Sequence, residues 1–381
     1  MCASVNSSAG FLGGASKLRY WGVDQQATKR RRSATCYATL KTVKPSFTAD
    51  VMRLGRTELE VSRLGIGTLQ WGDPGSGFGD TFGETELATA FDVLVHGGIN
   101  FFDTAEVYGY QNIKAGTSSE QLLGRFVSNN KSSRMKQPHP QGEDDDGKHF
   151  LSPVFATKFF TIPWTNFLVG GGFRLGRKSL LSALRASLKR IGQDKVDLYQ
   201  IHFPFPTFSN SALMESLKEA VEEGLTTAVG VSNYSQYQME EADDLLACYG
   251  IPLASNQVQY SLASRSPEEN GLLKACKERG ITLIAYSPLA SGLLTDKTLT
   301  RTDKRALMVR PLLNLMHTIG TTHGDRSIAQ VALNYLICKG GLPIAGCKTA
   351  QQAKAHCEVL DWQLDEDQVA SLEEKMRTLK L

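Results

Sequence analysis

The chain has 381 residues, 41% of them hydrophobic, and a formal net charge of +3. This length fits one large domain with an extension, or two medium ones, and the composition allows a large core. Its near-neutral charge excludes a general attraction to nucleic acid, and its longest uncharged apolar run falls short of the roughly 20 residues of a membrane helix. We therefore expect neither a nucleic-acid partner nor a transmembrane segment.

Residues 1–47 differ from the rest of the chain. They hold eight lysines and arginines against a single acid, Asp24, and they are rich in Ser, Ala and Thr. This composition is typical of an organelle transit peptide, and the abundant Ser and Thr favour a chloroplast over a mitochondrion. We expect residues 1–47 to be a disordered, removable chloroplast transit peptide, with a mitochondrial or cytoplasmic location less favoured.

The remainder, 51–381, alternates short apolar runs with helical patterns. Val51–Leu54 and Glu60–Ser62 predict a β-hairpin around Gly55. Eight strands are then expected, each followed by a helix, which predicts an α/β fold of the (β/α)8 TIM-barrel type. The expected strands are Leu64–Leu69, Ile99–Thr104, Val154–Phe159, Val196–His202, Ala228–Ser232, Ser255–Tyr260, Thr282–Ser287 and Leu342–Gly346.

Helical periodicity and capping residues separate these strands. Leu180, Leu184 and Leu188 recur at helical spacing, Ser235 is a plausible N-cap for Gln236–Leu246, and Gly280 ends another helix. Two connections are long. Residues 128–152 form a low-complexity insertion with an acidic run at 143–146, and Leu289 to about Asp325 lies where barrels bind ligands.

The cysteine pattern and the absent motifs exclude several kinds of site. Seven scattered cysteines with no C-x-x-C spacing indicate neither a disulfide framework nor a structural zinc site. We expect no metal, and we interpret the acidic run at 143–146 as a solvated loop. No G-x-G-x-x-G occurs, so a nicotinamide cofactor would have to bind in a mode other than that of a Rossmann fold.

Three neighbouring strands end in ionisable residues. The second ends at Asp103, with Tyr108 just beyond it, the third near Lys158 and the fourth at His202. Because a barrel's active site lies at the carboxyl ends of its strands, these four side chains should converge. Each has a structural alternative, as an ion pair, a strand cap or a packed ring, but four together favour a catalytic site.

The four residue types suit carbonyl chemistry. A charged Lys158 should lower the pKa of Tyr108, and Asp103 should hold that lysine in place. Tyr108 could then donate a proton to a carbonyl oxygen, which a neutral His202 would orient. A cofactor must supply the hydride, since no side chain can.

These motifs resemble the aldo-keto reductase superfamily, and most of all its plastid-targeted plant members. The resemblance covers about Met52 to Leu381 and rests on Phe102-Asp103-Thr104-Ala105 through Tyr108-Gly109, Thr157-Lys158-Phe159, Asp197–His202, Gly230–Asn233, Ser255–Gln257 and Tyr286–Leu289. It implies NADPH-dependent reduction of small-molecule aldehydes or ketones, with Asp103, Tyr108, Lys158 and His202 as the catalytic tetrad.

The resemblance also implies where NADPH or NADP+ binds. The nicotinamide carboxamide would contact Ser232, Asn233 and Gln257, and Tyr286 would stack on the ring. The pyrophosphate would lie on the backbone of Ser287, Leu289, Ser291 and Leu293. The loop from Gly346 through Lys348, Thr349 and Gln352 would take the 2′-phosphate, which favours NADPH over NADH. Two positions depart from the family: Ala355-His356 replaces Glu-Asn near the adenine, and Ala345 stands where Pro is expected.

Aromatic residues near the strand ends are candidates for the substrate walls. These are Trp71, Phe160, Trp164, Phe203 and Phe205. Two alternatives to a general carbonyl reductase stay open. One is an NADP(H)-sensing binding subunit similar to potassium-channel β-subunits, and the weaker one is a pyridoxal reductase. The sequence does not reveal the oligomeric state.

Overall fold

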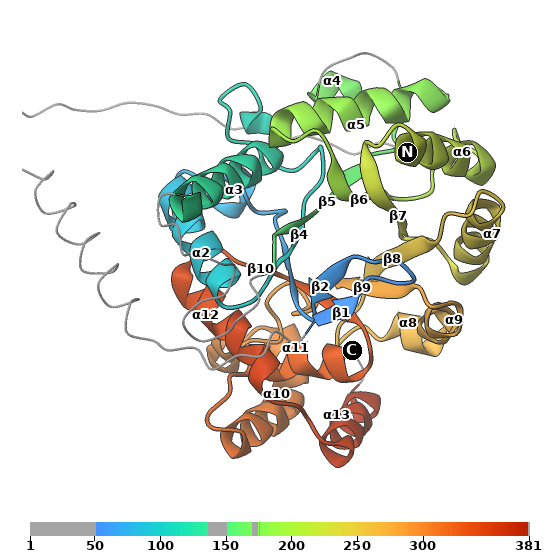
Figure 1. The fold of residues 1–381 in the computed structure, drawn as a ribbon. Coiled ribbons are helices and arrows are strands. Elements are labelled where there is room, and N and C mark those ends of the chain that lie inside the picture. The colour runs from blue at the N-terminus through green and yellow to red at the C-terminus, as the bar shows by residue number, and fades with distance from the viewer. Residues whose placement is uncertain (1–50, 136–150, 170–173, 175, 380–381) are drawn as a thin grey trace, which may run out of the picture. The chain divides into compact units, whose positions relative to one another are not determined.

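All eight expected strands are present in a computed structural model of the chain, which describes residues 51–135, 151–169, 174 and 176–379. They form a closed parallel barrel in the order β10-β3-β4-β5-β6-β7-β8-β9, surrounded by helices (Figure 1). The strands are β3 (Gly65–Gly67), β4 (Phe101–Asp103), β5 (Val154–Phe159), β6 (Val196–Ile201), β7 (Thr226–Ser232), β8 (Leu253–Gln259), β9 (Thr282–Tyr286) and β10 (Leu342–Gly346). The predicted (β/α)8 fold is confirmed.

The expected hairpin is present as β1 (Val51–Arg53) and β2 (Glu60–Ser62), which pair antiparallel. Its Leu54 and Val61 are fully buried and cluster with side chains from the strands of the barrel, such as Phe101 and Ile344. Gly55 closes the turn at φ +60, and a Cβ there would lie 2.4 Å from the carbonyl oxygen of Ala254. The hairpin therefore fits tightly against the barrel, where only glycine is accommodated.

The helices that surround the barrel follow the predicted alternation. They are α2 (Glu84–His96), α3 (Ser119–Met135), α4 (Asn166–Val169), α5 (Arg177–Ile191), α6 (Asn210–Glu222), α7 (Gln236–Ala247), α8 (Ser266–Glu269), α9 (Leu272–Arg279), α10 (Lys304–Thr322), α11 (Ile328–Cys338), α12 (Ala350–Cys357) and α13 (Glu366–Thr378). Short 3-10 helices are η1 (Pro74–Ser76), η2 (Tyr110–Asn112), η3 (Asp296–Thr300) and η4 (Glu358–Asp361). None of the described helices is long and apolar enough to cross a membrane.

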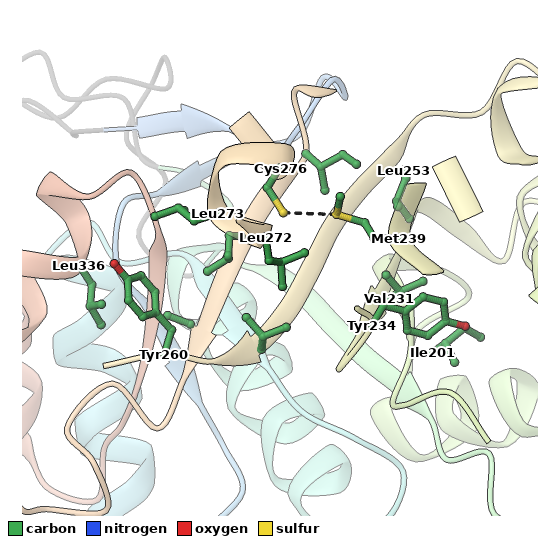
Figure 2. Packing of buried hydrophobic residues seen from close by; sticks show 14 of the residues in the cluster. Ile201, Val231, Tyr234, Met239, Leu253, Tyr260, Leu272, Leu273, Cys276 and Leu336 are labelled. Carbon is green, nitrogen blue, oxygen red and sulfur yellow. Dashed lines mark hydrogen bonds between the residues drawn. The ribbon is translucent and has the colours of Figure 1, made fainter. Parts of the chain in front are cut away.

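The expected caps and apolar faces hold these helices in place. Ser235 caps α7 and forms a capping box with Gln238, and Gly280 ends α9 in the left-handed conformation. In one cluster of buried apolar residues, α7 packs against β8 and α9 packs against β9, and Figure 2 shows side chains of this cluster. There the sulfur atoms of Met239 and Cys276 lie 3.3 Å apart.

Both long connections contain helical structure. The insertion expected at 128–152 begins inside α3, which continues to Met135, and its acidic run lies outside the described residues. The connection after β9 contains η3 and the 19-residue helix α10. Its sequence carries Pro311 inside that helix, which obscures the helical pattern.

Candidate active site

Asp103, Lys158 and Tyr108 meet at the carboxyl ends of β4 and β5. The Lys158 ammonium forms an ion pair with the Asp103 carboxylate, and both side chains are almost completely buried. Lys158 Nζ also donates to the carbonyl oxygen of Thr104 at 2.9 Å and makes a long contact of 3.5 Å with the Tyr108 hydroxyl. The lysine therefore links the carboxylate to the phenol, as the sequence predicted.

His202 completes this group from the end of β6. Its ring lies edge-to-face with Tyr108, with the centroids 5.8 Å apart. Its Nδ1 atom is buried and has no hydrogen-bond partner within the described part of the chain. A buried polar atom without a protein partner is a natural contact for a ligand. Four side chains from three neighbouring strand ends thus face one small volume.

The electrostatics differ in one respect from the expectation. Burial raises the pKa of Tyr108 above its usual 10.0, although Lys158 acts to lower it. The expected net lowering of this pKa is therefore wrong, because desolvation of a buried phenolate outweighs the neighbouring charge. Burial and Lys158 together hold the pKa of His202 well below 6.5. At neutral pH the site contains a phenol and a neutral imidazole.

Asp103 has two further partners inside the barrel. Its Oδ1 accepts hydrogen bonds from the side-chain amides of Gln200 at 3.0 Å and Gln257 at 2.9 Å. Gln257 was expected to contact a nicotinamide, and its amide nitrogen instead donates to the carboxylate. Gln200 was not predicted. Its position two residues before His202 puts it on the same face of β6 as the site, which is the only signal the sequence offers.

The residues expected around the nicotinamide lie side by side. Ser232 donates to the carbonyl oxygen of Gln257 at 2.8 Å, and the Asn233 amide donates to the carbonyl oxygen of His202 at 3.0 Å. Tyr286 donates its hydroxyl proton to the Asn233 side-chain oxygen at 3.0 Å. Asn233 adopts φ +60, an uncommon conformation that concentrates at ligand-binding positions.

The turn after β9, expected to hold a pyrophosphate, has unusual backbone angles. Ser287, Ala290 and Ser291 have φ between +50 and +55, and Gly292 follows at +85. Left-handed residues in turns are characteristic of concave anion sites formed by backbone N–H groups. The N–H of Leu293, also expected at this site, donates to the carbonyl oxygen of Ala290 at 3.2 Å.

Lys348 lies in the loop after β10, as expected. Its ammonium donates to the carbonyl oxygen of Ser76 at 2.9 Å and lies 4.7 Å from the ring centre of Phe82. Burial lowers its pKa; the charge of Asp73 acts to raise it, and that of Lys297 acts to lower it. Lys297 was not predicted, since η3 comes close to this loop only in the folded barrel. The Lys348 ammonium thus supplies a positive charge to this loop, with one acid and one further lysine nearby.

The rest of this loop is well ordered by its own hydrogen bonds. Thr349 caps α12 by accepting from the N–H of Gln352, and Gln352 accepts from the N–H of Lys348. Gly346 is exposed at the end of β10. His356, at a position expected near the adenine, is buried with Nε2 3.1 Å from the carbonyl oxygen of Gly346. Its imidazole thus stabilises the loop from inside.

The expected aromatic walls divide into two groups. The ring centre of Phe160 lies 5.1 Å from that of His202 and 4.9 Å from that of Phe203, and both contacts are edge-to-face. The rings of Phe160 and Phe203 therefore border the site. Trp164 is half exposed, and its ring centre lies 6.3 Å from that of Phe205. Trp71 is fully buried and donates its indole N–H to the carbonyl oxygen of Cys347 at 2.8 Å. Its placement does not fit the substrate-wall role expected of it.

None of the groups of His, Cys, Asp and Glu among the described residues has an arrangement that could hold a metal ion. The five cysteines that the structure describes are free thiols.

Comparisons with known proteins agree with this fold. The family model for aldo/keto reductases matches residues 63–377. The chain is 35% identical over 328 residues to the chloroplastic pyridoxal reductase of Arabidopsis thaliana, covering 83% of each protein. It is 28% identical to a thermostable aldo-keto reductase solved with the inhibitor epalrestat, with a TM-score of 0.64 over 85% of this chain and 99% of that one. The chain thus belongs to the aldo/keto reductase family and is an oxidoreductase.

Proposed function

We propose that the protein reduces aldehydes and ketones to alcohols with NADPH. The observation that carries this proposal is the hydroxyl of Tyr108, which receives a contact from Lys158 and whose raised pKa keeps its own proton in place. A protonated phenol beside a neutral imidazole can serve as a general acid toward a carbonyl oxygen.

Each residue of the site has a defined task in this reaction. Tyr108 gives its proton to the carbonyl oxygen as the alcohol forms. Lys158 stabilises the phenolate that remains, and Asp103 fixes the ammonium. His202 stays neutral, so it can donate a hydrogen bond that orients the carbonyl. A bound nicotinamide supplies the hydride.

The residues present fit such a cofactor. Asn233 and the turn from Ser287 to Gly292 have the strained backbone expected at a ligand site, and Tyr286 offers a partly exposed ring. Lys348 carries a positive charge in the loop after β10, where a 2′-phosphate is expected. The charge of Lys348 supports NADPH as the preferred reductant.

The direct test is a carbonyl panel assayed by loss of NADPH absorbance. We expect the purified chain to consume NADPH with aromatic and aliphatic aldehydes and to form one alcohol per NADPH oxidised. NADH should support the reaction poorly. If no carbonyl in the panel is turned over at a rate above background, while NADP+ and NADPH bind with different effects on a partner protein, the chain is an NADP(H)-sensing subunit instead.

A separate variant tests the preference for NADPH over NADH. Replacing Lys348 with alanine should weaken NADPH binding about tenfold, because a charge-assisted bond to the phosphate is lost, and should leave NADH binding nearly unchanged. Lys354 in α12, whose side chain is exposed, is the matched control, and Lys354→Ala should bind both cofactors as the wild type does. Binding is measured by fluorescence titration. Equal losses for NADPH and NADH in Lys348→Ala would refute the 2′-phosphate assignment.

One relative suggests a specific substrate. The chloroplastic reductase that shares 35% identity with this chain acts on pyridoxal by its name. Pyridoxal is an aromatic aldehyde, which suits a site bordered by Phe160 and Phe203. A kcat/KM for pyridoxal well above that for benzaldehyde would support this narrower function, and an equal or lower value would leave a general carbonyl reductase.

We also propose that residues 1–47 direct the protein to the plastid. The basic, Ser- and Thr-rich composition supports this, as does the chloroplastic relative. A fusion of residues 1–50 to a fluorescent protein should enter isolated chloroplasts and be shortened there. Import into mitochondria alone would contradict the assignment.

A further inference from the structure

A buried ion pair lies beside the tetrad without belonging to it. Glu106, two residues before Tyr108, pairs with Arg174, and each side chain is only 1% exposed. The pair is bidentate, with Arg174 Nη2 donating to Glu106 Oε2 at 2.7 Å and Nη1 donating to Oε1. Such forked pairs fix the relative position of the two segments that carry them.

The two partners also bind the backbone of Phe160, one at its N–H and the other at its carbonyl oxygen. The N–H of Phe160 donates to Glu106 Oε1 at 2.6 Å, and Arg174 Nη1 donates to the carbonyl oxygen of Phe160 at 2.8 Å. The backbone N–H of Arg174 donates to Pro163, and its guanidinium lies 4.9 Å from the ring centre of Phe159. The pair therefore ties the loop after β4 to the loop after β5.

These two loops carry the groups that would surround a carbonyl. The loop after β4 presents Tyr108, and the loop after β5 presents Phe160, whose ring contacts His202 and Phe203. A shift of Phe160 would move the aromatic wall away from the imidazole. The ion pair thus joins the segment that carries the proton donor to the segment that carries this aromatic ring.

Stability alone does not explain such a pair. Removing two charges from water carries a desolvation cost that their attraction often fails to exceed, and apolar side chains of similar volume can stabilise a fold equally well. What apolar residues could not do is bind both the N–H and the carbonyl oxygen of Phe160. The ion pair therefore fixes the backbone position of Phe160, which apolar side chains would not do.

We propose that Glu106 and Arg174 form a positioning clamp that sets Phe160 against His202 and Tyr108 for productive binding of aromatic carbonyl substrates. This inference rests on the proposed reductase function. The clamp touches neither substrate nor cofactor directly, so it should affect turnover and aldehyde selectivity while leaving NADPH binding intact.

The chain contains a matched control pair. Glu120 and Arg190 form another largely buried ion pair, with side chains 1% and 10% exposed. Their further hydrogen bonds go to Thr157 and Ser187. Thr157 alternates with Lys158 along β5 and therefore points away from the barrel interior. This pair supports the same strand without holding Phe160.

The test compares Arg174→Lys with Arg190→Lys in the full chain. Lysine keeps the charge, but one ammonium cannot reproduce the fork to Glu106 together with the bond to Phe160. For Arg174→Lys we expect kcat/KM with 4-nitrobenzaldehyde to fall about tenfold or more, and with propanal about threefold or less, because misplacement of a wall matters most for a bulky substrate. The NADPH Kd should change less than about twofold, as should all activities of Arg190→Lys.

A double variant separates positioning from folding. Glu106→Leu/Arg174→Met fills the same space without buried charge and should remain folded. It should nevertheless lose the same aromatic preference, and amide exchange at Phe160 should accelerate in it and in Arg174→Lys but not in Arg190→Lys. Wild-type selectivity in the folded double variant, or unchanged exchange at Phe160, would overturn the clamp. If the wild type reduces no aldehyde yet Phe160 exchange accelerates as expected, the clamp stands and the reductase function falls.

Discussion

Two clusters in this molecule contain the same residue types but differ in how they are connected. At the barrel mouth, Asp103 accepts from Lys158, and that lysine contacts the hydroxyl of Tyr108. Between α8, α11 and α13, Glu268 accepts from Lys339 at 3.1 Å and from the hydroxyls of Tyr260 at 2.7 Å and Tyr335 at 2.9 Å. Both clusters therefore combine a carboxylate, a lysine and a tyrosine.

The two clusters differ in the group to which the phenol donates its proton. Tyr260 and Tyr335 give their protons to a carboxylate, and burial beside that charge raises their pKa values far above 10. Tyr108 instead lies next to a donor, the Lys158 ammonium, so its own proton remains for a ligand. The comparison teaches that the direction of one hydrogen bond, more than the choice of residues, separates a structural cluster from a candidate general acid.

Replacing the lysine of each cluster with methionine should show the largest difference between the two clusters. Lys158→Met removes the stabilisation of the phenolate and leaves Asp103 buried without its counter-charge, so we expect a loss of kcat of about 10³ and a destabilisation of about 3–5 kcal/mol. Lys339→Met should leave kcat unchanged, because its cluster takes no part in catalysis. Steady-state kinetics and denaturant unfolding measure both. A catalytically normal Lys158→Met would show that the mouth cluster is structural too.

A substitution in the cluster around Glu268 should change the stability of the fold and leave turnover unchanged. Burial would raise the pKa of Glu268, but hydrogen bonds from Arg265, Tyr260 and Lys339 outweigh it and lower that pKa from 4.5 to about 2. A lowered carboxylate pKa stabilises the fold above pH 4.5, and this contribution is lost as the pH falls toward 2. Glu268→Gln should therefore cost about 2 kcal/mol at neutral pH.

Unfolding experiments across this range would check the sign. The difference between wild type and Glu268→Gln should shrink from pH 5 downward, to nearly zero by about pH 2. Turnover per folded molecule should equal that of the wild type. A difference that grows as the pH falls would mean that the carboxylate is not the stabilising form.

The smallest expected effect is the response of carbonyl reduction to pH. Because the pKa of His202 lies well below 6.5 and that of Tyr108 lies above 10.0, both groups keep their neutral forms between these values. Single-turnover reduction should vary less than about twofold from pH 6.5 to 9.5. An inflection inside this window would show that Lys158 outweighs burial in setting the pKa of the phenol.

Much of this fold could be predicted from sequence because barrel strands are short apolar runs with regular spacing. All eight strands and the hairpin were predicted, although β3 and β4 are shorter than expected. The helix α10 was missed, since Pro311 interrupts its pattern. Trp71 was expected at the substrate wall, but the direction of its ring depends on packing against Phe126, which no local pattern encodes.

The sequence could identify residues of the site only where they stand at the ends of strands. Asp103, Lys158 and His202 each end a strand, so their convergence follows from the barrel. The net rise in the pKa of Tyr108 depends on burial, which is a property of the folded state. Arg174 lies 68 residues from Glu106 in the chain, and only the folded loops bring the two together.

The most direct test of the central claim measures two tyrosine variants side by side. Tyr108→Phe and Tyr335→Phe each remove one hydroxyl from a lysine–carboxylate cluster, and both are mixed with NADPH and 4-nitrobenzaldehyde in a single-turnover experiment. We expect reduction to slow about 10³-fold in Tyr108→Phe, with NADPH still bound, and to stay at the wild-type rate in Tyr335→Phe. Equal rates in the two variants would contradict that claim.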